Sequence, residues 1–343
     1  MGSLKLKKVV IGILVALLAI ILAVAVAGIA YEQIARSSAQ DQHPPSGQLV
    51  GTPAAHLYCI GDIRTGSPTV ILEAGLDLFG SLSWSTIQTD LSHSLRVCSY
   101  DRPGIMWSAP ATTPRDANHI TQELRALLAA AGENPPYLLV GHSLGGLFVQ
   151  VYAARYPDEV QGLVLVDSSH PKQDRRLPRE AIEAEMPEPP PDWLISLFSQ
   201  TGALRLLSPF PERPLPASVT PALQFMSTSV AGLIGEARQI YVIAEQAEAA
   251  TLPTNLPIYV ISRGKEPEGI DQVLEPEVIL EVERVWRELQ SELANLSACG
   301  QHETVPDAGH YVHHDTPDTV IRVIQAVAHT STCASASTES PGD

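Results

Sequence analysis

Short apolar runs rich in Val, Ile and Leu recur along most of this chain, and segments with helical spacing lie between them. Such runs are typical of strands that are buried on both faces of a sheet. Because strands that alternate with helices form parallel sheets covered on both sides, we expect an α/β fold with a mostly parallel sheet flanked by helices. The predicted strands are Leu57–Ile60, Thr69–Glu73, Arg96–Tyr100, Tyr137–Val140, Leu163–Val166, Ile258–Ser262 and Glu303–Pro306.

Two of the predicted helices have recognisable ends. Apolar residues form one stripe along Ala117–Ala131, and Gly132 is typical of the position just after a helix. The second helix, Pro317–Ala328, begins with a proline, which suits the first helical turn. Thr316 is therefore expected to cap its N-terminus with its side chain.

The stretch between Val166 and Ile258 contains no good strand. It carries the proline clusters EPPPDW and PFPERPLP together with helical patterns such as Trp193–Phe198. Because a compact domain does not accommodate a structureless loop of this length, we predict a helical insertion at about residues 172–250. Ligands bind at the carboxyl ends of strands in such sheets, so we interpret the insertion as a lid over the site. The alternative is a helical appendage that stabilises the domain or contacts a membrane.

The N-terminal segment is separate from this domain. Val9–Tyr31 contains no charged residue and is long enough to cross a bilayer as a helix. Lysines precede it at positions 5, 7 and 8, so the positive-inside bias places residues 1–8 in the cytoplasm and the rest of the chain across the membrane. The alternative is a cleaved signal peptide, with Ala25-Val26-Ala27 before the cleavage site, which would give a secreted protein.

The remaining boundaries follow from composition. Residues 32–47 are polar and are interpreted as a linker between the membrane and the folded domain. Residues 48–328 are interpreted as the single α/β domain that contains the insertion. Residues 329–343 are small, polar and aperiodic, so they are predicted to be a disordered tail.

Charge and cysteine content narrow the classes of function. The formal net charge of −16 repels phosphate backbones, which argues against nucleic-acid binding. Four cysteines allow three full disulfide pairings. Cys59 and Cys98 lie in predicted strands, where they could equally be buried free thiols. Neither Cys-x-x-Cys nor His-Glu-x-x-His spacing occurs, so no metal site is predicted. The cysteines are Cys59, Cys98, Cys299 and Cys333.

The segment GHSLGG, residues 141–146, follows the predicted strand Tyr137–Val140 and precedes a run with helical spacing. A serine at a sharp strand-to-helix turn is typical of a nucleophile elbow. Gly141 and Gly145 suit such a turn because glycine removes side-chain clashes where chain segments approach closely. We therefore predict Ser143 to be a catalytic nucleophile.

A serine nucleophile needs a base to take its proton. His310 follows the last predicted strand and precedes the last helix, so it lies in a loop at the carboxyl end of the sheet. His313 and His314 are interpreted as ordinary loop residues at the start of that helix. His142 adjoins the nucleophile and is expected to line the pocket together with Gly75.

The acid that orients the base has more than one candidate. Asp167 directly follows a predicted strand and therefore lies at the carboxyl edge of the sheet. Glu266, Glu268 and Asp271 follow the strand Ile258–Ser262 and are the alternatives. Either choice keeps the chain order serine, acid, histidine, so the order alone leaves both open.

The oxyanion of a tetrahedral intermediate needs two backbone N–H donors. The residue after the nucleophile, Leu144, supplies one of them. Leu76 is predicted to supply the other, because it lies in the loop after Thr69–Glu73. Trp84 in the continuation of this loop is interpreted as a core residue rather than a pocket wall.

Taken together, five segments resemble the α/β-hydrolase superfamily, in particular its esterase- and lipase-like branch with a helical cap. The similarity covers about residues 50–328 and implies an eight-stranded sheet with the catalytic residues at the carboxyl ends of strands. The segments are LEAG (72–75), YDRPGIMWS (100–108), GHSLGG (141–146), LVLVDSSHP (163–171) and GHY (309–311).

The chain departs from the family pattern in two places. Met106 stands where the family's turn motif has a second glycine. Gly264 is not followed by an aspartate three positions on, and this absence favours Asp167 as the acid. In haloalkane dehalogenases the acid follows the strand that corresponds to Leu163–Val166, and a proline lies four residues after the acid. Pro171 has this spacing from Asp167. Because these enzymes and epoxide hydrolases use an aspartate nucleophile, Ser143 argues against both activities.

The expected function is that of a serine hydrolase, carboxylesterase- or lipase-like, which cleaves an ester-type bond through an acyl-enzyme intermediate. An apolar lid favours a small-molecule substrate with an apolar acyl group. The alternatives are an acyltransferase or thioesterase with the same triad, and a catalytically silent member that binds a ligand. No cofactor is implied, and the membrane is the expected partner of the N-terminal helix.

Overall fold

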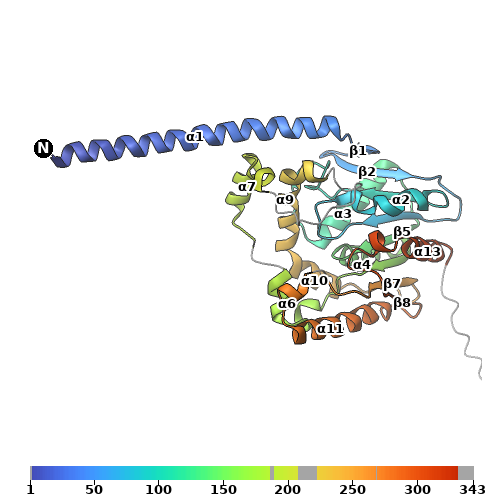
Figure 1. Ribbon diagram of the computed structural model, residues 1–343. Coiled ribbons are helices and arrows are strands. Elements are labelled where there is room, and N and C mark those ends of the chain that lie inside the picture. Colours follow the sequence, from blue (N-terminus) through green and yellow to red (C-terminus); the bar gives the residue numbers. More distant parts are fainter. Residues whose placement is uncertain (1, 186–188, 208–221, 268, 331–343) are drawn as a thin grey trace, which may run out of the picture.

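The computed structural model of the chain describes residues 2–185, 189–207, 222–267 and 269–330. Its centre is an eight-stranded sheet in the order β1-β2-β4-β3-β5-β6-β7-β8 (Figure 1). β1, β2 and β4 pair antiparallel, and the pairs from β4 onward are parallel, which confirms the predicted fold class. The strands are β1 Gln48–Val50, β2 Ala55–Ile60, β3 Thr69–Glu73, β4 Arg96–Tyr100, β5 Tyr137–His142, β6 Val160–Val166, β7 Ile258–Arg263 and β8 Gln301–Val305.

Every predicted strand is present, and the predicted and observed strands differ only in where they begin and end. β5 continues to His142 because the backbone stays extended up to the sharp turn. β8 ends before Pro306, which has no N–H to donate to a ladder. β1 was not predicted, because it is only three residues long and mostly exposed, so it has no buried apolar pattern.

Successive residues along the parallel strands point to opposite faces, and helices cover each face with a separate core. On one face, residues such as Ile71 and Leu139 pack against α3 Ala117–Ala131, α4 Gly145–Arg155 and the end of α11 Pro276–Ala294. On the other face, their neighbours Val70 and Leu138 pack against α2 Ser85–Ser92 and α13 Pro317–Ala328. Both clusters are almost fully buried, which explains why the strands are apolar throughout.

Trp84 ends the 3-10 helix η1, Gly80–Trp84, just before α2. Its side chain is fully buried in the second cluster, as the core interpretation expected.

The two helices predicted with definite ends have those ends. Gly132 follows α3 with φ 78°, a left-handed conformation that favours glycine. Thr316 precedes α13 but does not cap it, since its hydroxyl donates to the Val312 carbonyl oxygen at 3.1 Å. The predicted side-chain cap is therefore wrong. The hydroxyl instead closes the short helix α12, Val312–Asp315, which leaves it turned away from α13.

The insertion between β6 and β7 is helical, as predicted, and we call it the cap. Its helix α10 packs on α3 and α4 through Ile243 and Ala244. Residues 186–188 and 208–221, which include Glu188 of EPPPDW and the whole of PFPERPLP, lie outside the described residues. The helices are α5 Gln173–Arg176, α6 Arg179–Glu185, α7 Asp192–Gln200, α8 Ala203–Leu207, α9 Ala222–Arg238 and α10 Ile240–Glu248.

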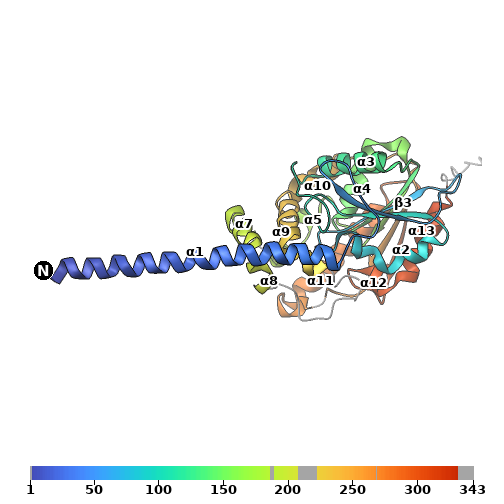
Figure 2. The same cartoon turned by 90° about the horizontal axis from the view of Figure 1, so that it is seen from above.

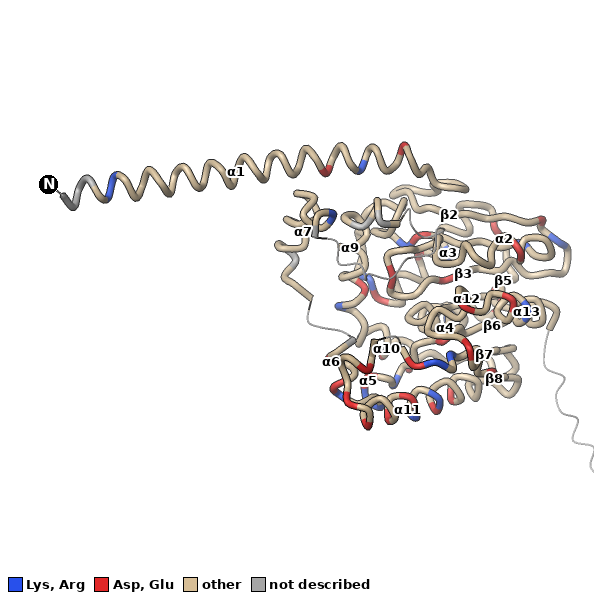
Figure 3. The backbone as a smooth tube through the Cα atoms, viewed as in Figure 1, with Lys and Arg blue, Asp and Glu red and all other residues tan. Residues whose placement is uncertain are grey.

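The N-terminal helix α1, Gly2–Gln42, has 41 residues and is therefore about 60 Å long. Leu6–Gln42 is long and apolar enough to cross a membrane, with a mean hydropathy of 3.4 in its most apolar window. Figure 3 shows that this part of α1 carries no charged residue between Lys8 and Glu32. The first residues of the predicted linker, 32–42, are helical rather than irregular.

The second half of α1 is helical because one side of it packs on the cap, beside α7 and α9 (Figures 1 and 2). Gly28 approaches the backbone of Thr201 so closely that a Cβ there would lie 2.6 Å from the Thr201 oxygen. Glu32 and Ala39 are buried on the same side. Contacts at three- and four-residue spacing form one helix face, so the cap supplies the partner that stabilises this segment.

The structure settles one pairing of the cysteines. Cys59 and Cys98 are neighbours in the antiparallel register of β2 and β4 and form a disulfide. The reading of these two as free buried thiols is therefore wrong. Cys333 and the rest of the predicted disordered tail beyond residue 330 lie outside the described residues.

Candidate active site

Ser143 lies at the turn between β5 and α4 with φ 51°, a left-handed conformation that is strained for a serine. The turn is held from both sides. The Ser143 N–H donates to the Val166 carbonyl oxygen at 3.2 Å, and the Ser143 carbonyl oxygen accepts from the Ser169 N–H at 2.9 Å. These bonds tie the turn to the carboxyl end of β6, so the serine is fixed at the edge of the sheet.

Both predicted elbow glycines have a steric reason. A Cβ at Gly141 would lie 2.7 Å from the Gly145 oxygen and the Gly146 Cα. A Cβ at Gly145 would lie 2.5 Å from the Ala74 oxygen. Side chains do not fit at such distances, so glycine lets α4 start directly beneath the loop that follows β3.

The structure joins His310 to Asp167. His310 Nδ1 lies 2.6 Å from the Asp167 carboxylate oxygen Oδ2. The other oxygen, Oδ1, accepts from the Trp286 indole N–H at 2.9 Å and from the Arg263 backbone N–H at 3.1 Å. Asp167 itself is fully buried and has φ 40°. The carboxylate therefore has one fixed orientation, which in turn fixes the imidazole.

Charge and hydrogen bonding keep Asp167 ionised. Burial alone would raise its pKa, but the hydrogen bond and charge of His310 and the charge of Arg263 outweigh burial and lower the pKa. Neither of the two alternative acids that the structure describes takes this place. Glu266 and Asp271 are exposed, and Glu268 lies outside the described residues.

His142 is 1% exposed, so it packs beneath the site rather than lining a pocket as expected. Its Nε2 lies 3.0 Å from the His310 carbonyl oxygen, and the two rings are 4.6 Å apart between centroids. Burial, followed by the charge of His310, holds its pKa well below the ordinary value. His142 is thus a neutral ring that supports the His310 loop, and His313, equally buried, packs against it.

Leu144 directly follows Ser143, and Leu76 follows Gly75 in the loop after β3. Neither N–H has an acceptor in the part of the chain that the structure describes. Gly75 lies against the serine, since a Cβ there would be 3.0 Å from the Ser143 Cβ. Among the described residues, neither Ser143 Oγ nor His310 Nε2 has a hydrogen-bond partner, and no hydrogen bond joins the two atoms.

Arg102 holds the loop that carries Leu76, a role that the sequence reasoning missed. Its guanidinium donates to the carbonyl oxygens of Ala74 at 2.8 Å and Gly75 at 2.7 Å. It also pairs with the buried carboxylates of Glu73 and Glu236. With these carbonyls turned toward Arg102, the loop presents N–H groups on its other side. The arginine belongs to the quoted segment YDRPGIMWS, but its partners are distant in sequence.

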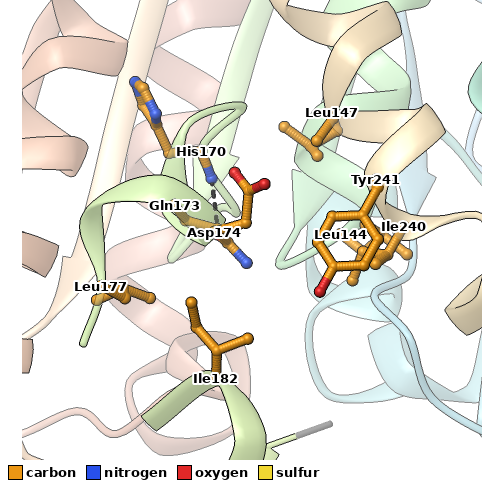
Figure 4. A pocket seen from close by; sticks show the side chains of 10 residues that line it. Leu144, Leu147, His170, Gln173, Asp174, Leu177, Ile182, Ile240 and Tyr241 are labelled. Atoms are coloured by element: carbon orange, nitrogen blue, oxygen red, sulfur yellow. Dashed lines mark hydrogen bonds between the residues drawn. The ribbon is translucent and has the colours of Figure 1, made fainter. Parts of the chain in front are cut away.

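A pocket lies beside the turn. Leu144, which precedes α4, and Leu147 lie on one side of it together with Ile240 and Tyr241 of α10, and the segment from His170 to Leu177 lies opposite (Figure 4). The walls are mostly apolar, and His170, Gln173 and Asp174 form the polar part. The cap residues that complete the walls are Leu177, Ile182, Ile240, Tyr241 and Ala244.

Among the described residues, one group of metal-ligand types lies close together, Cys59, Cys98 and Glu133. Its two sulfurs are joined in the disulfide, so this group is not arranged to hold an ion.

Sequence comparison finds one family model and several relatives that match the chain. The model of the alpha/beta hydrolase family matches residues 70–323. YqjL, an uncharacterised protein of Bacillus subtilis, is 24% identical over 273 residues, which cover 75% of this chain and 83% of that protein. The (lyso)-N-acylphosphatidylethanolamine lipase of Bos taurus is 29% identical over 122 residues, 35% of this chain and 34% of the lipase. An uncharacterised Schizosaccharomyces pombe protein is 42% identical over 78 residues, only 15% of its length.

Solved structures share the fold. A putative lipase from Acinetobacter baumannii AYE has a TM-score of 0.55 at 18% identity, covering 86% of this chain and 96% of that one. An esterase from Exiguobacterium antarcticum has a TM-score of 0.59 at 15% identity, covering 83% of this chain and 100% of that one.

Proposed function

The chain belongs to the alpha/beta hydrolase family, and we propose that it is a serine hydrolase that cleaves carboxylic ester-type bonds through an acyl-enzyme. The observation that carries this proposal is the 2.6 Å hydrogen bond between His310 and the buried Asp167, formed beside the left-handed turn at Ser143. An imidazole oriented by a carboxylate, beside a partly exposed serine, is the arrangement that nucleophilic acyl transfer requires.

In the proposed first step, His310 Nε2 accepts the proton of Ser143 while Oγ attacks the ester carbonyl carbon. The oxyanion that forms accepts hydrogen bonds from the Leu144 and Leu76 N–H groups, each worth about 3 kcal/mol of the barrier. The alcohol leaves with the proton held by His310. Water activated by His310 then attacks the acyl-enzyme and releases the acid, with Asp167 stabilising the imidazolium in both steps.

The walls of the pocket support an apolar acyl group as part of the substrate. The Leu144 side chain lines that pocket, and the Leu144 N–H is a proposed oxyanion donor. An acyl chain bound in the pocket would therefore have its carbonyl carbon beside Ser143. The lipase and esterase neighbours act on esters according to their names, and this agrees with the proposal. In this reading the cap is the lid over the site.

We further propose that α1 is a single-pass anchor. Its apolar stretch Val9–Tyr31 would span the bilayer, with residues 1–8 in the cytoplasm and the hydrolase domain on the opposite side. The three lysines before the span, against a single arginine shortly after it, support this orientation. A mature protein that begins just after Ala27 would instead show a cleaved signal peptide and a secreted enzyme.

A panel of p-nitrophenyl esters that differ in acyl length tests the proposed activity. The full chain should hydrolyse them, with a preference for chains long enough to fill the apolar pocket. Ser143→Ala should abolish turnover, whereas Ser291→Ala, an exposed serine on α11, should leave it unchanged. A folded wild-type protein without turnover on any ester would refute the proposal. Transfer to an added alcohol in preference to water would identify an acyltransferase.

A further inference from the structure

A second, larger groove lies apart from the pocket beside Ser143 and shares none of its lining residues. It has a volume of about 930 Å³ and runs between the end of α1, helices α7 and α9 of the cap, and the loop after β4. This volume is within the range of small-molecule sites. Among the described lining residues there is no Asp or Glu, and the charged ones are Arg36, Arg115, Arg205 and Arg238.

Arg115 is a buried arginine of this groove, and two of its three side-chain nitrogens lack acceptors. Its side chain is 5% exposed, and its Nη1 donates to Glu123 at 2.7 Å. Its Nε and Nη2 are buried without a hydrogen-bond partner. The Glu236 carboxylate is 3.8 Å away from Nη2 and is already hydrogen-bonded by Arg102. Buried N–H donors without acceptors are unfavourable, so an acceptor-rich ligand would satisfy them.

Two further arginines of the groove, Arg36 and Arg205, have more positive charge than their acidic partner neutralises. Both donate to the same buried carboxylate, Glu32, at 2.7 Å. One carboxylate cannot neutralise two guanidinium groups, so a net positive charge remains. The groove also has an apolar part, which includes Met106, Trp107, Ile195, Phe225 and Ile234. Positive charge beside an apolar wall is the chemistry of a site for an anionic amphiphile.

The groove lies next to the proposed membrane span. Arg36 follows Tyr31 by five positions on the same helix, which is an axial rise of about 7.5 Å. The headgroup layer of a bilayer adds about 5–8 Å on each side of the hydrocarbon core. If α1 crosses the membrane, Arg36 is therefore at the depth of the lipid phosphates.

We propose that this groove binds a phosphate group at the membrane surface, with Arg115 as its inner ligand and Arg36 and Arg205 at its mouth. Guanidinium groups suit phosphate because they donate pairs of parallel N–H bonds. The proposal rests on the anchored topology proposed above and is independent of the role of Ser143. Glu236 pairs with Arg102 and lies 3.8 Å from Arg115, so the proposed inner ligand is linked through this carboxylate to the arginine that holds the oxyanion loop.

Binding is measured on the full chain in dodecylmaltoside micelles, with Ser143→Ala so that no lipid is consumed. The probes are dioctanoyl phosphatidic acid, inorganic phosphate and the neutral dioctanoylglycerol. Phosphatidic acid should bind saturably, and Arg115→Gln should weaken it at least tenfold, the effect of losing charge-assisted hydrogen bonds. Arg36→Gln should weaken it about threefold or more. Arg284→Gln, on the exposed face of α11, should have no effect.

Binding of inorganic phosphate with the same dependence on Arg115 supports a phosphate site filled by the free anion. Binding of phosphatidic acid alone supports a lipid headgroup as the source. Equal binding of the neutral lipid, or affinities unchanged in both the Arg115 and Arg36 variants, overturns the proposal. If the Arg115 variant does not fold, the more exposed Arg36 variant decides. If phosphatidic acid binds while esters are not hydrolysed, only the proposed function fails.

Discussion

Asp167→Asn isolates the role of the acid because it removes a charge without removing volume. In the structure, Oδ1 accepts from Trp286 and the Arg263 backbone, whereas Oδ2 faces His310 Nδ1. The asparagine oxygen can keep the first two bonds, which leaves its NH₂ group facing the imidazole. His310 must then present Nδ1 as an acceptor and carry its proton on Nε2, so it cannot take the proton of Ser143.

The expected loss in turnover is about 10⁴-fold, or roughly 5.5 kcal/mol, since a histidine in the wrong tautomer costs this much in serine hydrolases. The assay is the steady-state hydrolysis of a p-nitrophenyl ester, with far-ultraviolet circular dichroism to confirm folding. Glu266→Gln and Asp271→Asn are matched controls, because both carboxylates are exposed and should be dispensable. Turnover within tenfold of wild type in Asp167→Asn, or a crippling loss in either control, would refute the reasoning.

Three further outcomes are expected. Burial raises the pKa of Asp77 to about 6, above its unfolded value. The free energy of unfolding should therefore fall by up to about 3 kcal/mol as pH rises from about 4 to 6. Urea denaturation at a series of pH values should show this fall in the wild type and not in Asp77→Asn. Gly145→Ala would place a Cβ 2.5 Å from the Ala74 oxygen and displace the oxyanion loop, so kcat should drop at least about 100-fold in ester hydrolysis, and wild-type turnover would contradict this. Cys59 and Cys98 are 39 positions apart, so replacing both with serine should cost about 4 kcal/mol in chemical denaturation, and an unchanged midpoint would show that the disulfide does not stabilise the fold.

The low-pH behaviour of Asp167 has the opposite sign to that of Asp77. Its pKa is lowered on folding, so it contributes stability that is present above its unfolded pKa and is lost as pH falls through the folded value. Asp167→Asn should therefore be less sensitive to acid than the wild type below about pH 4, as measured by the unfolding midpoint. An identical acid transition in both proteins would contradict this.

The central sheet was predictable because its strands are apolar on both faces. Each strand therefore appears in the sequence as a short continuous apolar run, which can be recognised without knowing its neighbours in the fold. Ser143 and His310 were predictable for a similar reason, since a strand end and its following loop place them at one edge. β1 was missed because three exposed residues carry no such signal. Helicity beyond residue 31 was missed because it depends on contacts between Glu32 and cap residues that are far apart in sequence.

The choice of acid shows where sequence reasoning stops. Asp167 and the later carboxylates both follow strands that end at the same edge, so spacing could not separate them. What separates them is the buried indole of Trp286 and the backbone of Arg263, which hold one carboxylate toward His310. Arg102 was missed for the same reason, because its four partners come from different parts of the chain.

Covalent labelling tests the central claim most directly. The full-length protein is incubated with a fluorophosphonate, digested, and its peptides are mapped by mass spectrometry. The account predicts one adduct on Ser143, in the peptide that contains GHSLGG, and no adduct in the Ser143→Ala variant. A folded protein that remains unlabelled, or one labelled at another serine while Ser143 stays free, would contradict it.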